Sequence, residues 1–306
     1  MKMPKACTPQ QQKQFTRFVE DAAVRALTVT GLDKEGVQSL LMNGGEFQAE
    51  IEAHVTAVAR RLSLCNQYAS EEVESTCTYP EEYTGPKKIG DQVEILANAF
   101  GFDAERSFDF IFNTLPNLEL PSGAEGWFAI PSVDALAKRH FPSITDPAEQ
   151  YCCAVDLMVQ KIEDERDIVN YRKGQIRAAY FRQHPRTVSA LRKISETQKG
   201  DIIVVPAQFG MRYRGRSARR AREVFLFNEF GLGALAVGSM ILAHPERLVC
   251  WEQLHLECPG DEYDYGGGRW ADLFFFNWVQ DRITMHTAWS VDANHNYGSV
   301  TGFIPA

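Results

Sequence analysis

A run of arginines between an apolar segment and a helical pattern carries the clearest chemical signal in the sequence. The apolar segment 202–205 predicts a buried strand that ends at Pro206, and Ser217 is placed to cap a helix after it. Arginine side chains bind phosphate through two parallel hydrogen bonds, and a glycine-containing turn before a helix can receive an anion. The candidate anion-binding residues of this stretch are Arg212, Arg214, Gly215, Arg216, Ser217, Arg219, Arg220 and Arg222.

The position of these arginines implies that they need negative partners. Arg219 and Arg220 fall in the first turn of the expected helix, where the helix dipole disfavours a positive charge by about 0.3–1 kcal/mol. Glu223 can pair with either of them along the helix, but a surplus of positive charge remains. The stretch lacks the GxxxxGK[ST] pattern, so it is not a phosphate loop of the nucleotide-binding type.

The charge of the chain is strongly segregated. The segment 172–222 holds fourteen Lys and Arg residues against two acids, a net charge of +12, whereas the rest of the chain carries −20. Either this basic segment meets an external polyanion, or the acidic part of the protein neutralises it. Three further candidate anion-binding residues lie at its start: Arg172, Lys173 and Arg177.

Two other features bear on these alternatives. Tyr180 and Phe181 lie among the arginines, where aromatic rings either stack on nucleic-acid bases or anchor a helix in the core. The segment 71–90 holds five glutamates and no sustained periodicity, which predicts an extended acidic loop. That loop is either a linker that wraps the body or an internal counter-charge for the basic segment.

Other combinations of reactive side chains give weaker signals. Cys250 and Cys258 are eight residues apart, about 26 Å along an extended strand, so they cannot share a metal ion without a fold-back. The late aspartates are typical of turns between strands. We find no GxSxG or HExxH motif, and we predict no metal site, no cofactor and no identified catalytic residue.

The elements that position these residues predict an α+β fold. Helical patterns dominate the first seventy residues, mixed patterns follow, and β patterns prevail after position 248. One helix is expected from 146 to about 170, introduced by Asp146 and Pro147. We expect a helical N-terminal part at 1–70, the acidic loop at 71–90 and a mixed α/β body at 91–306.

From the composition we expect a cytoplasmic protein. The polar start has no apolar signal segment, and the longest apolar run, 230–243, is shorter than the roughly 20 residues that span a bilayer. The seven cysteines are an odd number, which favours free thiols in a reducing compartment.

Several blocks of the sequence resemble a group of bacterial proteins of unknown function. The blocks are YPEEY (79–83), GAEGWFAIP (123–131), RGRSARRAREV (214–224), HPERL (244–248) and GSVTGFIP (298–305). This resemblance implies no activity, cofactor or substrate, and it transfers no functional residue.

Three functions remain open on the sequence alone. The first is binding of a polyanion, above all nucleic acid, through the Arg-rich stretch 200–222 with help from Arg172, Lys173 and Arg177. The second is an enzyme that acts on a phosphorylated small molecule or a nucleotide, for which a deep pocket at 210–222 is expected. The third is an assembly protein whose basic segment docks an acidic partner or a second copy of the chain.

Overall fold

The computed structural model describes residues 8–62 and 67–305, and the chain divides into two compact units, Met1–Leu64 and Cys65–Ala306. The acidic segment 71–90 belongs to the larger unit. Among the described residues, no helix is both long enough and apolar enough to cross a bilayer.

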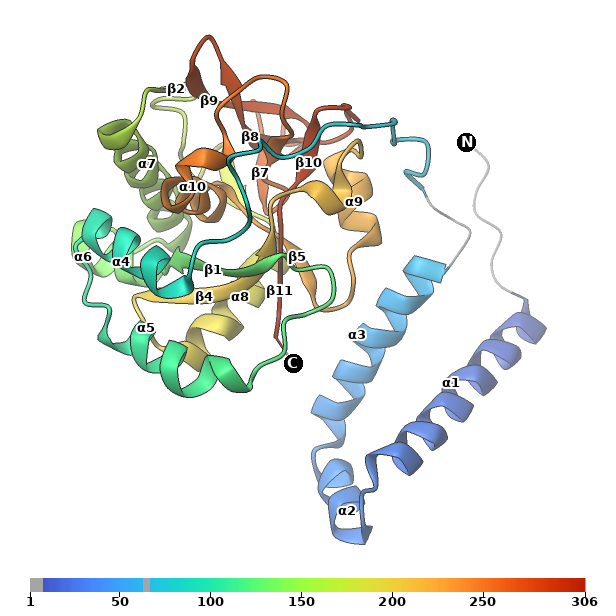
Figure 1. Cartoon of the computed structure of the whole chain (residues 1–306). Coiled ribbons are helices and arrows are strands. Elements are labelled where there is room, and N and C mark those ends of the chain that lie inside the picture. The colour runs from blue at the N-terminus through green and yellow to red at the C-terminus, as the bar shows by residue number, and fades with distance from the viewer. Residues whose placement is uncertain (1–7, 63–66, 306) are drawn as a thin grey trace. The chain divides into compact units, whose positions relative to one another are not determined.

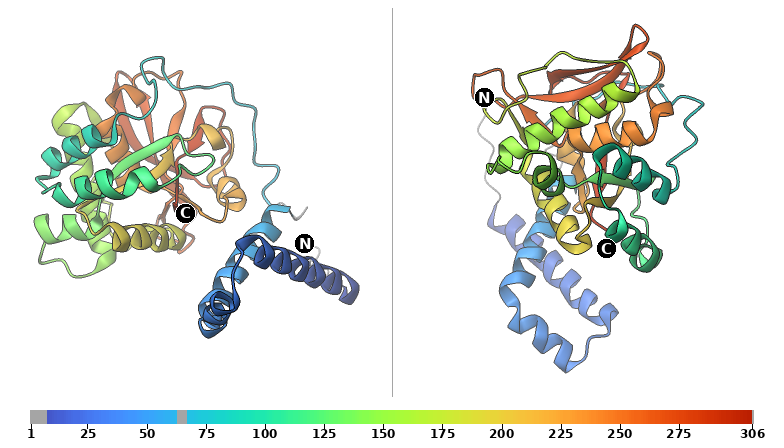
Figure 2. Two further views of the ribbon diagram at one scale, coloured as in Figure 1. Left: turned by 60° about the horizontal axis from the view of Figure 1, so that its bottom comes forward. Right: turned by 90° about the vertical axis from the view of Figure 1, so that its left-hand side faces the viewer.

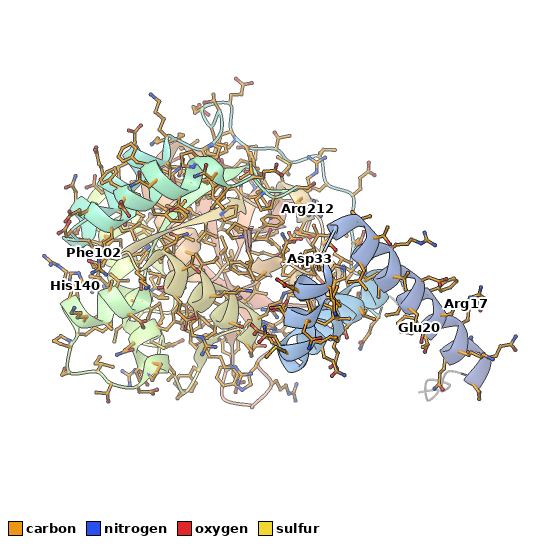
Figure 3. The ribbon with its side chains drawn as sticks, turned by 90° about the horizontal axis from the view of Figure 1, so that it is seen from below. Arg17, Glu20, Asp33, Phe102, His140 and Arg212 are labelled. Carbon is orange, nitrogen blue, oxygen red and sulfur yellow. The ribbon has the colours of Figure 1, made fainter. Side chains whose placement is uncertain are left out.

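The described residues of the smaller unit, 8–62, form three helices, α1 (Pro9–Thr30), α2 (Lys34–Met42) and α3 (Gly44–Leu62). Thr8 caps α1: its hydroxyl accepts from the amide of Gln11 at 3.3 Å, and the Gln11 side chain accepts from the Thr8 amide at 2.9 Å. No residue of α1 or α2 is buried, and charged residues such as Arg17 and Glu20 lie along α1 (Figure 3).

The described residues of the larger unit, 67–305, form seven α-helices and two sheets, arranged as in Figure 1, which confirms the predicted α+β class. The helices are α4 (Ile89–Phe100), α5 (Glu105–Asp109), α6 (Val133–His140), α7 (Pro147–Glu165), α8 (Pro185–Gln198), α9 (Ala218–Val224) and α10 (Ala234–Ala243). Phe102, after α4, contacts His140 at the end of α6 edge-on, with 6.4 Å between ring centroids (Figure 3).

The first sheet is antiparallel, with strand order β1-β4-β11-β5. Its strands are β1 (Gly126–Pro131), β4 (Ile202–Gln208), β11 (Thr301–Phe303) and β5 (Glu229–Gly231). Every residue of β4 is buried, as the sequence predicted for 202–205, but the strand continues past Pro206 to Gln208.

The second sheet is mixed. Its strands are β2 (Ile168–Asn170), β3 (Phe181–Gln183), β6 (His255–Glu257), β7 (Asp261–Tyr263), β8 (Asp272–Val279), β9 (Arg282–Trp289) and β10 (Tyr297–Ser299). The order is β10-β6-β8-β7-β3, while β9 pairs with β8 and β2. The expected helix 146–170 ends at Glu165 because Ile168–Asn170 instead pairs in parallel with β9.

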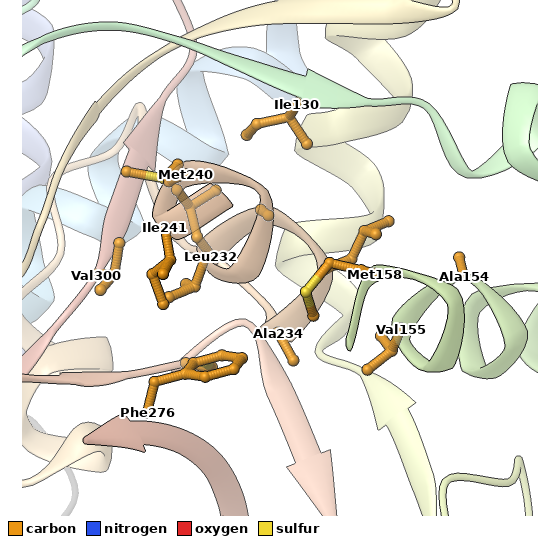
Figure 4. Packing of buried hydrophobic residues seen from close by; sticks show 14 of the residues in the cluster. Ile130, Ala154, Val155, Met158, Leu232, Ala234, Met240, Ile241, Phe276 and Val300 are labelled. Carbon is orange, nitrogen blue, oxygen red and sulfur yellow. The ribbon is translucent and has the colours of Figure 1, made fainter. Parts of the chain in front are cut away.

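The core lies where α7 and α10 pack together against both sheets (Figures 2 and 4). Met158 of α7 meets α10 at Gly238, where a Cβ atom would lie 1.9 Å from the Met158 sulfur. Phe276 of β8 and Ile130 of β1 belong to the same buried cluster. This shared core fixes the surface loops that follow β2, β4 and β7.

Candidate nucleic-acid interface

The arginine turn, residues 211–224, joins β4 to α9 as the sequence predicted. Ser217 caps α9, because its hydroxyl accepts from the amide of Arg220 at 3.1 Å. The amides around it already have backbone partners: Gly215 donates to Tyr297 at 2.9 Å, and Arg219 donates to Ser290 at 3.0 Å. These amides are therefore engaged within the protein and do not form an open nest for an anion.

The acidic strap, residues 71–88, runs directly over this turn. The Val73 amide donates to the Gly215 carbonyl at 2.7 Å, and the Ser217 amide donates to the Glu71 carbonyl at 3.1 Å. Gly215 has a φ of +75°, and a Cβ atom there would lie 2.3 Å from the Val73 oxygen. Gly215 is thus required for the close approach of the strap.

Glutamates of the strap pair with three of the arginines. Glu71 accepts from Nε of Arg219 at 2.7 and 2.9 Å and also accepts from the Ser217 hydroxyl at 2.6 Å. The hydrogen bond from Arg219 holds the pKa of Glu71 below its usual value, against the opposing effect of burial. The partial burial of this pair makes it stronger than an exposed ion pair.

Glu72 lies between two further guanidinium groups. It is 2.6 Å from Nε of Arg220 and 3.3 Å from Nε of Arg216. Arg220 also reaches Glu223 at 2.9 Å, so the helical partner expected from the sequence pairs with Arg220, while Arg219 takes Glu71. Three acids thereby compensate the positive charge at the start of α9.

The other guanidinium groups of the turn are also engaged. Arg212 lies 3.6 Å from buried Glu229, and Arg214 donates to the Cys77 carbonyl at 3.1 Å. Arg222 donates to the carbonyls of Pro259 and Asp261 at 2.8 and 2.6 Å. The acidic strap and the body together supply the internal counter-charge that the sequence left as one of two explanations.

Arg172 lies in a different environment, on the loop between β2 and β3. Its Nε donates to the Thr287 hydroxyl at 2.9 Å, and one Nη donates to Gln175 at 3.3 Å. The guanidinium also donates to the Tyr265 hydroxyl and lies 4.6 Å from the centre of that ring. None of these hydrogen-bond partners is a carboxylate, but Arg172 favours the charged form of the nearby Asp272.

Two exposed tyrosines lie near this arginine. Tyr180 and Tyr265 are 41% and 56% exposed, and the Tyr180 carbonyl accepts from the Asp264 amide at 2.8 Å. Lys173 and Arg177 are exposed on the same loop. The tyrosine–arginine face is defined by Arg172, Lys173, Arg177, Tyr180 and Tyr265. The ring of Tyr171 packs instead on His286, on the opposite side of β9 from the Thr287 hydroxyl that Arg172 contacts.

A glycine-rich turn presents Tyr265. The Asp264 carboxylate accepts from the amides of Gly267 and Gly268 at 3.0 and 2.6 Å. Gly266 and Gly268 have φ values of +96° and +71°, a conformation that glycine adopts without strain. The turn therefore holds Tyr265 in place while leaving its ring exposed.

Two carboxyl groups near this face have raised pKa values. Burial raises the pKa of Asp272 to about 6, and Arg172 opposes the rise. Burial likewise raises the pKa of Asp156 to about 6, against the effect of Arg177 and Lys173. Part of the negative charge beside the face is therefore lost just below neutral pH.

Two acidic residues near the end of the chain, Glu257 and Asp261, have structural partners. Glu257 accepts from the Ser299 hydroxyl at 2.9 Å, and the Asp261 carboxylate accepts from the Tyr151 hydroxyl at 2.7 Å and from the Ala234 amide at 2.5 Å. In the part of the chain that the structure describes, no group of three or more His, Cys, Asp or Glu residues is arranged to hold a metal ion.

An enzyme that uses the arginine turn was expected to have a deep pocket at 210–222. Two pockets of the described residues, with volumes of about 680 and 580 Å³, lie elsewhere. Residues outside 210–222 line both of them. No protein-family model matches the chain, and no curated protein and no solved structure shows significant similarity to it.

Sequence reasoning missed Tyr265 as a member of a common surface with Arg172. Tyr265 lies 93 positions away from Arg172 in the chain, and its hydroxyl contact depends on the pairing of β9 with β2. The only local signal was the DYGGG sequence (264–268), which indicates a turn but not its neighbours.

Proposed function

We propose that the protein binds single-stranded nucleic acid through the tyrosine–arginine face. The proposal depends on one observation: exposed tyrosine rings lie among basic side chains, and none of these basic side chains forms a salt bridge with a described carboxylate. Exposed rings stack on bases of any sequence, and basic side chains beside them follow the phosphates. The proposed ligand is a polyanion, as in the hypothesis from the sequence, but the proposed contact surface is the tyrosine–arginine face and not the arginine turn.

The arginine turn is not the primary contact in this proposal. Arg216, Arg219 and Arg220 already hold Glu71, Glu72 or Glu223. A phosphate would have to displace these carboxylates, and breaking each hydrogen-bonded ion pair would offset the gain from a new one. Arg172, Lys173 and Arg177 form no ion pair with a described carboxylate that a phosphate would have to break, and only the longer-range charges of Asp272 and Asp156 act on them.

Fluorescence anisotropy with a labelled oligo-dT or oligo-U strand tests the proposal. Three phosphate contacts predict that log K falls against log salt with a slope of about −2. Tyr265→Ala should weaken binding by about tenfold, since stacking contributes ~1–3 kcal/mol per base. Tyr265→Phe keeps the ring and separates stacking from the loss of the hydroxyl contacts to Arg172 and Thr287.

Phe112→Ala is the matched control, because Phe112 is an exposed aromatic residue on the segment Phe110–Thr114, away from the face. It should leave affinity unchanged. Absence of binding by the wild-type protein at low salt (about 50 mM) would reject the proposal. Equal losses in Tyr265→Ala and Phe112→Ala would reject the assignment to this face.

Self-association through the smaller unit is a second candidate function. Helices α1 and α2 bury no residue, while Phe15, Phe18 and Leu41 are 49%, 63% and 68% exposed. Exposed apolar surface of this extent is typical of an interaction site. The sequence 1–64 holds eight basic and seven acidic residues, so a second copy meets no net repulsion and is the partner we infer.

Sedimentation of the full chain tests self-association. The wild-type protein should sediment as a dimer or larger species, and the double change Phe15→Glu and Phe18→Glu should give a monomer. Changing Gln12 and Gln14 to Glu adds the same charge at exposed positions of α1 and should leave the assembly intact. A monomeric wild-type protein at high concentration would contradict this candidate.

A further inference from the structure

A pocket of about 580 Å³ lies in the larger unit, apart from the tyrosine–arginine face. It is bounded by the end of β1, by the first turns of α6, α7 and α10, and by one side of α8. Its lining is mainly aliphatic and includes Val188, Leu191, Ile203 and Leu235. Pockets of this volume with apolar walls and few polar groups are typical of small-molecule sites.

Ser132 is the polar group that marks one end of the pocket. It precedes α6, its side chain makes no capping bond, and the residue is only 9% exposed. Its amide is fixed by a 2.8 Å hydrogen bond to the Asp201 carbonyl, while its hydroxyl makes no capping bond. This hydroxyl is not one of the fully buried atoms that lack a partner, so it opens to the pocket, where water or a ligand can bind it.

The start of α6 adds donors at the same place. The residues after Ser132, Val133 and Asp134, also line the pocket, and no side chain caps this helix. The first amides of a helix lack intrahelical partners and favour an acceptor or an anion. At α10, by contrast, the Asp261 carboxylate already accepts from the Ala234 amide.

The charged side chains at the mouth largely offset one another. Arg192 and Glu196 form an exposed pair at 3.7 Å, and Arg182 lies 2.8 Å from Glu262. Asp134 is the remaining exposed acid. The donors that the pocket offers to a ligand are the Ser132 hydroxyl and the amides at the start of α6.

We propose that this pocket binds a small molecule with an aliphatic body and a terminal carboxylate, which accepts hydrogen bonds from Ser132 and from the start of α6. The aliphatic body packs against Val188, Leu191 and Leu235. The site is independent of nucleic-acid binding, because it shares no residue with the tyrosine–arginine face.

Saturation-transfer NMR on the full chain with octanoate and octylamine tests this site. Octanoate should bind more tightly than octylamine, which has the same aliphatic length and the opposite charge. Ser132→Ala should weaken octanoate binding by about fivefold, the effect of one hydrogen bond of ~1 kcal/mol, and should leave octylamine unchanged.

Val188→Trp should abolish octanoate binding by filling the pocket. Val188 is 44% exposed, so a larger side chain there is compatible with folding. Ser189→Trp, at the next and exposed position of α8, does not line the pocket and should bind octanoate normally. No saturation transfer with octanoate, tighter binding of octylamine, or equal binding by both tryptophan variants would overturn the proposal.

Discussion

The pair formed by Glu71 and Arg219 is expected to stabilise the protein measurably, because it ties the acidic strap to the arginine turn. The Glu71 side chain is 16% exposed and that of Arg219 is 37% exposed. Hydrogen bonds to charged groups contribute ~1.5–3 kcal/mol when buried, whereas exposed ion pairs contribute up to ~1 kcal/mol. Allowing for screening at Arg219, we expect a coupling free energy of about 1–2 kcal/mol.

A double-mutant cycle measures that coupling directly. The variants are Glu71→Gln, Arg219→Ala and the double change, each unfolded with urea. All five tryptophans lie after position 126, so tryptophan fluorescence reports on the larger unit. The matched control is the cycle on Arg192 and Glu196, whose side chains are 73% and 70% exposed and should couple by less than ~0.5 kcal/mol.

The pH dependence of the cycle has a defined sign. The pKa of Glu71 is lowered in the folded protein, mainly by the hydrogen bond from Arg219. The coupling should therefore be complete above about pH 4.5, the region of the unfolded pKa, and should vanish as the pH falls through the lower folded value. A coupling at pH 7 no larger than that of the control pair would refute the reasoning.

Three further outcomes are expected. Gly215→Ala should lower the free energy of unfolding by about 1–3 kcal/mol and raise hydrogen exchange in the strap at 71–75, because the new Cβ would meet the Val73 oxygen at 2.3 Å; unchanged exchange would contradict this role. Gly238→Ala should lower Tm by about 3–8 °C in calorimetry, since its Cβ would lie 1.9 Å from the Met158 sulfur; a Tm within a degree of wild type would show that α7 and α10 can separate at no cost. Nucleic-acid affinity should rise about three- to fivefold as the pH falls from 7.5 to 5.5, because Asp272 and Asp156, each with a pKa of about 6, lose their negative charge. Changing both residues to Asn should remove most of this rise. An undiminished rise in that variant would exclude these two carboxyl groups as its source.

Local features of the fold could be predicted from the sequence because they depend on neighbouring residues. Thr8 and Pro9 start α1, and Ser217 caps α9, as their side-chain chemistry predicts. The apolar segment 202–205 gives a strand that is buried along its whole length. The end of α7 was predicted wrongly, because pairing of Ile168–Asn170 with β9 is a long-range contact that outweighs the local helical pattern.

The partners of the arginines could not be predicted because they come from distant parts of the chain. Glu71 lies 148 positions before Arg219, and Tyr265 lies 93 positions after Arg172. Composition showed that the basic segment needs negative partners, and the structure supplies Glu71 and Glu72 from the acidic strap. The lack of an ion pair between Arg172 and a described carboxylate was equally invisible in the sequence, because charge counts do not show which pairs form.

Photochemical cross-linking of a bromouracil-containing single strand to the wild-type protein, followed by peptide mass spectrometry, tests the central claim most directly. The proposal predicts cross-links to Tyr180 or Tyr265, whose exposed rings are placed to stack on bases. Cross-links confined to 211–224 would contradict it, since they would place the nucleic acid on the arginine turn that Glu71 and Glu72 already occupy.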